Sequence, residues 1–429
     1  MYRTLTKTAI VGLLGSAAAL NNGVAITPQM GWNSWNTFAC DIDQDVILQS
    51  AQKLVDLGLR DLGYNYVGID DCWQADARDP DTNKLSYNMD KFPDGIKSVA
   101  DKIHAQEMKV GIYSSARTQT CGQNPASLGY ETEDATSYAD WGIDLLKYDN
   151  CFNQGQAGNQ KLSYDRYNAM SQALNATGRP IVYAMCNWGE DSPWKFAPTI
   201  ANSWRTTGDI TDKFTGEDAR CPCKGDEGLD CPLAGYHCSV TNILEKSASL
   251  GQKAHTGAWN DLDSLEVGVG NLTVTQSKSH FTMWAFMKSP LMIGANLDTI
   301  DDESLEILRN KAVIDVNQDE FGSTARRVWK RQVGDGDLQL WLAALSGDVY
   351  AIAVLNTSSQ QQSTAVRFDE VFRGIDYEDS DRQGTYNLID MWQKDGDAWG
   401  LGVGNATGTL EDVQVEPFGV MAYRLTKSA

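Results

Sequence analysis

The sequence predicts an α/β protein, a (β/α)8 TIM barrel followed by a C-terminal antiparallel β-sandwich. The chain has 429 residues, which is enough for two or three domains of ordinary size. Over about the first 300 residues, short apolar segments alternate with amphipathic helical patterns, as in parallel sheets with right-handed crossovers. After Asn317 the pattern changes to apolar residues alternating with polar ones, which indicates antiparallel strands.

Eight apolar segments supply the strands of the predicted barrel. In chain order they are Met30–Trp35, Tyr64–Asp71, Lys109–Ser115, Asp144–Cys151, Pro180–Cys186, Asn202–Asp209, Lys253–Asp261 and Pro290–Asn296. Between them, Asp45–Leu57 and Ser163–Ala176 place apolar residues every three or four positions, as a helix with one buried face requires. Eight such units in about 300 residues match a barrel. The alternative is an open doubly wound sheet, which has fewer strands and usually a glycine-rich phosphate loop near its start.

The last part of the chain, about 105 residues long, has the pattern of a β-sandwich. Its predicted strands are Val328–Trp329, Leu338–Leu345, Val349–Asn356, Thr364–Phe368, Thr385–Met391 and Val413–Tyr423. Turns rich in Gly, Asp and Ser separate these segments, and none of the connections has a convincing helical pattern.

The charge of the chain excludes two classes of partner. It has 57 acidic and 36 basic side chains, and its formal net charge is −21. A chain this acidic repels the phosphates of nucleic acids and of anionic membranes. We therefore expect neither a nucleic acid nor a membrane as partner, and the sequence leaves the oligomeric state open.

The start of the chain has the pattern of a secretory signal. Arg3 and Lys7 precede the apolar run Ala9–Leu14, and the small residues Ser16–Ala19 follow it. The run is too short to span a membrane, and no later run reaches about 18 uninterrupted apolar residues. We expect a secreted, extracellular protein whose regions are a signal peptide over 1–20, the barrel over 21–318 and the β-sandwich over 319–429.

Secretion determines which modifications we expect. Four Asn-X-Ser/Thr sequons predict N-glycosylation at Asn175, Asn271, Asn356 and Asn405. Disulfides are the default state of the nine cysteines in an oxidising compartment. A Gly- and Asp-rich insertion after the sixth strand holds four cysteines that allow three pairings, namely Cys221, Cys223, Cys231 and Cys238. A zinc cluster is the alternative there, and secretion favours two disulfides.

Acidic residues recur at the carboxyl ends of the predicted strands, where the active sites of barrels lie. Asp70 and Asp71 end the second strand, Asp149 the fourth and Asp209 the sixth, while Asp263 follows the seventh. Any one of these acids could instead end a strand or cap a helix. Their combination indicates a site built from carboxylates.

Two of these acids each have a cation on the same strand face. Lys147 shares a face with Asp149, and Arg205 shares one with Asp209, because side chains alternate along a strand. Two carboxylates on alternate strands, one ionised and one protonated, form an acid and base pair of the kind that cleaves glycosidic bonds. The pattern therefore favours a glycoside hydrolase.

Five short motifs lie in order along the predicted barrel. They are Met30–Trp35, Asp70–Trp73, Leu145–Cys151, Trp204–Asp209 and Trp259–Asp263. They resemble the successive motifs of the glycoside hydrolase family that holds the eukaryotic α-galactosidases (melibiases) and the α-N-acetylgalactosaminidases, and the resemblance extends to the end of the chain. It implies a retaining mechanism with Asp149 as nucleophile and Asp209 as general acid and then general base.

The resemblance also implies which residues bind the sugar. A galactose pocket should be lined by Trp35, Asp70, Asp71, Tyr113, Lys147 and Arg205, with Asp263 near its mouth. The paired acids Asp70 and Asp71 can accept hydrogen bonds from O4 and O6, which rejects the epimer glucose. We expect Lys147 to hold the pKa of Asp149 low, and Asp209 to be protonated when substrate binds. This chemistry needs no metal and no organic cofactor.

The cysteines, and the size of the side chains after the fifth strand, indicate the branch of the family. The resemblance implies the disulfides Cys40–Cys72 and Cys121–Cys151, and it leaves Cys186 as a free thiol facing the sugar, as in the plant and fungal branch. The α-N-acetylgalactosaminidases make room for the N-acetyl group with small residues after the fifth strand, whereas Cys186 and Trp188 are bulkier.

Together the residues and the resemblance predict a secreted, retaining exo-α-galactosidase. It would release terminal galactose from α-galactoside oligosaccharides or from galactomannan side chains. Two alternatives stay open, an α-N-acetylgalactosaminidase and a galactose-binding lectin without catalysis. The presence of both Asp149 and Asp209 argues against the lectin.

Overall fold

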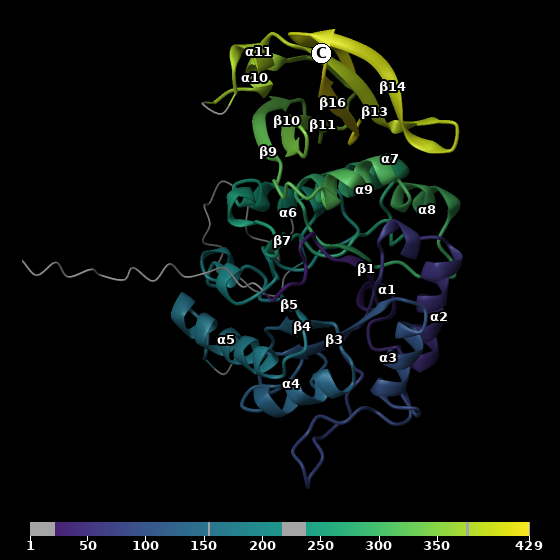
Figure 1. Cartoon of the computed structure of the whole chain (residues 1–429), viewed down its shortest axis with the longest axis vertical. Coiled ribbons are helices and arrows are strands. Elements are labelled where there is room, and N and C mark those ends of the chain that lie inside the picture. The colour runs from purple at the N-terminus through teal and green to yellow at the C-terminus, as the bar shows by residue number, and fades with distance from the viewer. Residues whose placement is uncertain (1–21, 153–154, 217–236, 375–376, 429) are drawn as a thin grey trace, which may run out of the picture.

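The structure is a computed structural model, and it describes residues 22–152, 155–216, 237–374 and 377–428. A barrel of parallel strands ringed by helices comes first, and an antiparallel β-domain lies against helices α7 and α9 of the barrel (Figure 1). The predicted fold class is confirmed. The predicted signal peptide, 1–20, lies outside the described residues.

Eight parallel strands form the barrel, in the hydrogen-bonded order β7-β6-β5-β4-β3-β2-β1-β8. Their bounds are β1 (Met30–Asn33), β2 (Tyr66–Ile69), β3 (Lys109–Ser115), β4 (Leu145–Asp149), β5 (Val182–Met185), β6 (Ser203–Arg205), β7 (Trp259–Asp261) and β8 (Leu291–Ile293). An isolated parallel bridge between Leu265 and Ile293 joins the segment after β7 to β8 and closes the ring. Each strand lies within one of the eight predicted segments.

Helices follow the strands and cover the outside of the barrel (Figure 1). They are α1 (Trp35–Phe38), α2 (Gln44–Asp56), α3 (Ile96–His104), α4 (Glu131–Asp140), α5 (Gln160–Ala176), α6 (Val240–Ser247), α7 (Val274–Phe286), α8 (Asp302–Leu308) and α9 (Lys311–Gln318). Four single 3-10 turns are η1 (Arg60–Leu62), η2 (Pro193–Lys195), η3 (Ala197–Thr199) and η5 (Gly251–Lys253). Side-chain caps stabilise the first turns of several helices. At the start of α2, for example, the Asp43 carboxylate accepts a hydrogen bond from the Val46 N–H at 2.8 Å.

The C-terminal domain is a hydrogen-bonded antiparallel sheet of eight strands with its own hydrophobic core. The strands are β9 (Arg326–Val333), β10 (Gly336–Leu345), β11 (Val349–Asn356), β12 (Gln362–Arg367), β13 (Thr385–Asp395), β14 (Ala398–Thr407), β15 (Thr409–Val415) and β16 (Val420–Lys427). Their order is β12-β15-β14-β13-β16-β11-β10-β9. Two short helices, α10 (Phe368–Val371) and α11 (Asp379–Arg382), lie between β12 and β13.

The structure corrects three predictions for this domain. The sequence does not predict β14, because Gly400, Gly402 and Gly404 interrupt the strand pattern there. The segment Val413–Tyr423, predicted as one strand, is two strands, because the chain turns at Phe418, whose φ is 56°. The helices α10 and α11 are also absent from the prediction, since each has only four residues and therefore shows no periodicity.

The two domains share a hydrophobic core. Trp341 and Met391 of the β-domain belong to the same buried cluster as the apolar residues of the barrel. The Asn310 Nδ2 atom, at the start of α9, donates to the backbone oxygen of Met391 at 2.9 Å. The β-domain therefore packs part of its apolar surface into the barrel core, in addition to having a core of its own. None of the helices in the described ranges is long and apolar enough to cross a membrane.

Candidate active site

A cavity of about 350 Å³ lies at the carboxyl ends of the barrel strands. Successive strands or the loops that follow them contribute its lining residues, which are Trp35, Asn36, Ala39, Asp70, Tyr113, Cys121, Lys147, Asp149, Cys186, Arg205, Asp209, Ile210, His237, Asp263 and Glu266. Because parallel strands bring their carboxyl ends to one face, side chains far apart in the sequence meet here.

Asp149 is the last residue of β4, and only 6% of its surface is exposed. Its Oδ2 accepts from the Tyr113 hydroxyl at 2.8 Å, and its Oδ1 accepts from the Asn150 N–H at 2.8 Å. Burial raises the pKa of Asp149 to about 7, although Lys147 and these hydrogen bonds act in the opposite direction. The expectation that Lys147 holds this pKa low is wrong, because desolvation outweighs the cation.

Lys147 is engaged with a different carboxylate. Its Nζ donates to Asp70 Oδ2 at 2.8 Å, and the same oxygen accepts from Asn33 Nδ2 at 2.8 Å. Asp70 is 1% exposed, whereas the Lys147 side chain is 25% exposed, so only the carboxylate of this ion pair is shielded from solvent. Lys147 thus links the acid at the end of β2 to the strand that carries Asp149.

Arg205, the last residue of β6, joins two further acids. Its Nη2 lies 3.0 Å from Asp209 Oδ1 and 2.8 Å from Asp263 Oδ2. The Ile210 N–H also donates to Asp263 Oδ2, at 2.8 Å, which ties the loop after β6 to the loop after β7. The side chain of Asp209 is 38% exposed, in contrast to buried Asp149. Of the two acids predicted to be catalytic, Asp149 is therefore buried and Asp209 accessible.

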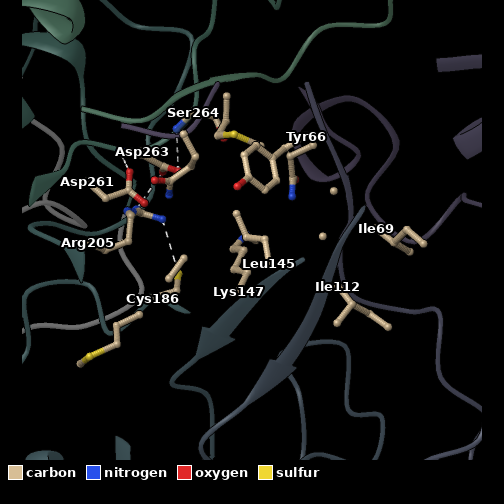
Figure 2. A pocket seen from close by; sticks show the side chains of 17 residues that line it. Tyr66, Ile69, Ile112, Leu145, Lys147, Cys186, Arg205, Asp261, Asp263 and Ser264 are labelled. Atoms are coloured by element: carbon tan, nitrogen blue, oxygen red, sulfur yellow. Dashed lines mark hydrogen bonds and ion pairs between the residues drawn. The ribbon is translucent and has the colours of Figure 1, made fainter. Parts of the chain in front are cut away.

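A smaller cavity of about 50 Å³ lies next to this site and is drawn in Figure 2. Lys147, Cys186, Arg205 and Asp263 line both cavities. Asp261 lies in the inner cavity, and burial raises its pKa to about 6. The charged groups of the site thus lie between the two cavities.

Comparison with protein families decides between the possible uses of this cavity. A family model described as Alpha galactosidase A matches residues 27–219 and 234–319 of the chain. A second model, the Alpha galactosidase C-terminal beta sandwich domain, matches residues 335–425. The chain belongs to the alpha-galactosidase family.

Individual α-galactosidases are similar to this chain over most of its length. An alpha-galactosidase of Lachancea cidri is 46% identical over 387 residues, which are 88% of this chain and 81% of that protein. A solved alpha-galactosidase of Saccharomyces cerevisiae superposes with a TM-score of 0.92 at 41% identity and covers 96% of this chain and 100% of that chain. A structure of an alpha-galactosidase from the same yeast with raffinose has a TM-score of 0.91 at 42% identity, covering 95% and 99%. The chain is thus a glycoside hydrolase with α-galactosidase activity.

The cavity of this α-galactosidase brings together nearly all the sugar-site residues predicted from the sequence. Two lie elsewhere in the described part of the chain. Asp71 is 1% exposed, and its carboxylate accepts from the backbone N–H groups of Gly122 at 2.6 Å and Cys72 at 2.7 Å, so it braces the loop that carries Cys121. Trp188 is half-buried and adopts a φ of 57°. Sugar contacts from these two residues stay predictions.

Several residues that line the cavity were not predicted from the sequence. Glu266 is 3% exposed, and burial raises its pKa to about 8. The Asn36 amide donates a hydrogen bond to its Oε1. Glu266 lies three residues after Asp263, in the same acid-rich run, and this spacing was the available signal. His237, after the insertion, also lines the cavity.

Two disulfides brace the loops of the site. The structure pairs Cys40 with Cys72 and Cys121 with Cys151, as the resemblance implies. Cys186 is a free, buried thiol, 3.6 Å from Arg205 Nη1. Cys238 is disulfide-bonded, whereas the other three cysteines of the insertion, Cys221, Cys223 and Cys231, lie outside the described residues. The pairing within the insertion stays a prediction.

The four sequons have different environments. Asn175, Asn271 and Asn405 are exposed, as glycosylation requires. Asn356 is fully buried, and its Nδ2 donates to the backbone oxygens of Gln360 at 2.8 Å and Glu416 at 2.9 Å. The prediction of a glycan at Asn356 is wrong for the folded protein, because the atom that would carry it is enclosed and hydrogen-bonded.

Proposed function

We propose that the enzyme cleaves α-galactosides by double displacement, with Asp149 as nucleophile and Asp209 as general acid and base. The observation that carries this proposal is the pair of carboxylates in one cavity, one buried and fixed by two hydrogen bonds, the other accessible. Retaining glycosidases use such a pair.

The two steps assign each proton and bond. In the first, an Asp149 oxygen bonds to C1 of galactose, the glycosidic bond breaks, and the Asp209 carboxyl gives its proton to the leaving oxygen. In the second, water attacks C1, transfers a proton to Asp209, and releases galactose and the Asp149 carboxylate. Tyr113 and Asn150 support the ionised form of Asp149, since both donate hydrogen bonds to it.

The charges around Asp149 and the exposure of Asp209 also bear on these roles. Asp209 is among the charges that raise the pKa of Asp149, so the two carboxylates disfavour joint ionisation. Lys147 favours the ionised form of Asp149. Asp209 is the more accessible of the two acids, as a group that gives a proton to a leaving oxygen must be.

We assign the substrate class as oligosaccharides with a terminal α-galactose, with galactomannan side chains as a second class. The yeast relative solved with raffinose supports oligosaccharides. Asp70 lines the cavity with oxygens that can accept from sugar hydroxyls, and polar pockets of this kind reject epimers that leave their groups unpaired.

The substitution Asp149→Asn tests the nucleophile on an aryl α-galactoside. We expect loss of turnover by about 10⁴-fold or more, because no covalent intermediate forms. Retained turnover would remove Asp149 from this role. Binding of galactose without hydrolysis by the unmodified protein would support the lectin instead.

The α-N-acetylgalactosaminidase remains the alternative activity, and Cys186 bears on it. Its buried side chain lines the cavity, so it restricts the room available to a group on C2. We expect kcat/KM for an aryl α-galactoside to exceed that for the 2-acetamido analogue by at least about 100-fold. Comparable values for the two substrates would favour the alternative.

Secretion is part of the proposal and follows from the pattern of the first twenty residues and the exposed sequons. Expression of the full chain in a eukaryotic host should release the enzyme into the medium with glycans at Asn175, Asn271 and Asn405. Peptide mass spectrometry before and after glycan removal tests this, and enzyme retained inside the cell without glycans would contradict it.

A further inference from the structure

Two buried arginines converge on the residue next to Asp149. Arg117 lies in the loop after β3 and is fully buried, and Arg166 in α5 is 4% exposed. The Asn150 side-chain oxygen accepts from Arg117 Nε at 3.2 Å and Nη2 at 2.6 Å, and from Arg166 Nη2 at 2.8 Å. Three donors from two segments thus fix one amide oxygen.

Asn150 connects these arginines to the nucleophile. Its backbone N–H donates to Asp149 Oδ1 at 2.8 Å, and its Nδ2 donates to Glu190 Oε2, in the loop after β5. Glu190 also lies 3.7 Å from Arg117 Nη2. The orientation of Asn150 is therefore set by three different elements, and with it the direction of the N–H that holds the Asp149 carboxylate.

The cluster also has an excess of positive charge. Among the described residues, Glu190 is the carboxylate within ion-pair distance of Arg117, and Asp149 is a further acid whose charge acts on Arg117. The Arg117 Nη1 and Arg166 Nε atoms have no hydrogen-bond acceptor in the described part of the chain. Burial and the Arg166 charge lower the pKa of Arg117 to about 10, while Asp149 acts in the opposite direction. Because such an interaction is mutual, Arg117 favours the ionised form of Asp149.

We infer that Arg117 is a positioning residue for the nucleophile: it holds Asn150 against the Asp149 carboxylate and supplies positive charge behind it. The inference rests on the proposed role of Asp149. Neither the acid and base pair nor the sugar pocket includes Arg117, which acts only through Asn150 and through its charge.

Other titratable groups surround Asp149 and contribute to its ionisation. From the elements packed around it they are Tyr113, Lys147, Tyr167, Cys186, Asp209, Arg166 and Glu190. A test must therefore change Arg117 alone and compare it with a partly buried arginine outside this cluster. Arg78 serves as that control: it is bound to Asp134 at 2.8 and 2.6 Å and contacts neither Asp149 nor Asn150 among the described residues.

The main test is the pH dependence of kcat/KM, measured with an aryl α-galactoside on Arg117→Met, Arg117→Lys and Arg78→Met. We expect the acid limb of Arg117→Met to move to higher pH by about half a unit or more, because Asp149 becomes harder to ionise. Arg117→Lys should recover most of this shift, and kcat should fall more than KM rises. Arg78→Met should lower the thermal unfolding temperature and leave the acid limb in place.

A second measurement guards against a simple loss of structure. In Arg117→Ala the missing group can be supplied as free guanidinium at concentrations well below those that unfold the enzyme, and we expect activity to recover several-fold. Arg78→Ala should show no such recovery. An acid limb of Arg117→Met that coincides with that of the unmodified enzyme, or one that Arg78→Met shifts equally, overturns the inference.

The parallel measurement on Asp149→Asn separates this inference from the proposed function. If Asp149→Asn keeps its turnover, the nucleophile assignment fails, and the Arg117 inference fails with it. If Asp149→Asn is inactive and the Arg117 variants show no shift and no rescue, only the positioning role fails.

Discussion

Lys147 donates a hydrogen bond to Asp70 at 2.8 Å, although it shares a strand with Asp149. One cation therefore serves two acids: it pairs directly with Asp70 and acts on Asp149 through space. This arrangement couples Asp70, a predicted sugar contact, to Asp149, the proposed nucleophile.

The substitution Asp70→Asn tests the coupling. It removes the ionic partner of Lys147 and a carboxylate that faces the cavity. We therefore expect kcat/KM to fall by the factor that corresponds to a loss of about 2–4 kcal/mol in transition-state binding. Asp134→Asn is the matched control, since Asp134 is equally buried but bonded to Arg78 and does not line the cavity. The control should lower the thermal unfolding temperature and leave the inhibition constant of galactose unchanged. Equal galactose inhibition for Asp70→Asn and the unmodified enzyme would argue against a contact with the sugar.

Tyr113→Phe should shift the pH profile. The Tyr113 hydroxyl donates to Asp149 and stabilises its ionised form, so it lowers the pKa of Asp149. Without the hydroxyl this pKa rises above about 7, less of the nucleophile is ionised at a given acidic pH, and the acid limb of kcat/KM moves to higher pH. A pH series on an aryl α-galactoside measures the shift. A limb that stays in place or moves to lower pH contradicts the assignment.

Asp209→Ala should separate the two chemical steps. Substrates with good leaving groups, such as aryl α-galactosides, need little acid assistance, so their first step should persist. Substrates whose leaving group is another sugar should lose about 10³-fold or more in rate. Azide then replaces the water that Asp209 would activate, and the product should be α-galactosyl azide, because attack occurs on a β-linked intermediate. Identification of the product anomer by NMR checks the role. A β-azide would assign Asp209 as the nucleophile.

The buried acids should make the folded enzyme more stable in mild acid. Burial raises the pKa of Glu266 from 4.5 to about 8, so between these values the folded state binds more protons than the unfolded state. This contribution to stability is full below pH 4.5 and is lost as the pH rises through about 8. We expect the thermal unfolding temperature to fall by a few degrees from pH 5 to 8. Glu266→Gln keeps the acceptor for Asn36 and should flatten this slope; an unchanged slope would contradict it.

Lys288→Met should weaken the attachment of the end of α9 to the barrel. The Lys288 Nζ is buried and donates to the backbone oxygens of Val316 at 3.1 Å, Asn317 at 3.0 Å and Asp319 at 2.7 Å. Methionine fills similar space but leaves three carbonyls, two of them in buried residues, without this donor, which costs about 2–4 kcal/mol. Denaturant unfolding measures the loss. The exposed Lys311→Met, at the start of the same α9, should change stability by less than about 0.5 kcal/mol.

The sequence by itself determined the order of elements and the main acids of the site. Strand parity and helical period are local, so segments such as Lys109–Ser115 are recognisable without knowledge of their neighbours. The rule that barrel sites lie at the carboxyl ends of strands then selects Asp149 and Asp209. Local patterns failed where glycines replace apolar residues, as in β14.

The tertiary structure alone decided how these groups behave. The amide of Asn36 bonds to Glu266, 230 positions away, and Arg117 meets Asn150 across two strands, so neither contact has a local sequence signal. Many segments contribute to the burial of Asp149, and this burial raises its pKa more than the nearby Lys147 lowers it. Only the position of Lys147 on the same strand face could be predicted from the sequence. Burial likewise removed Asn356 from the glycosylation sites. Period and spacing act along the chain, whereas desolvation and through-space charge depend on what folding brings together.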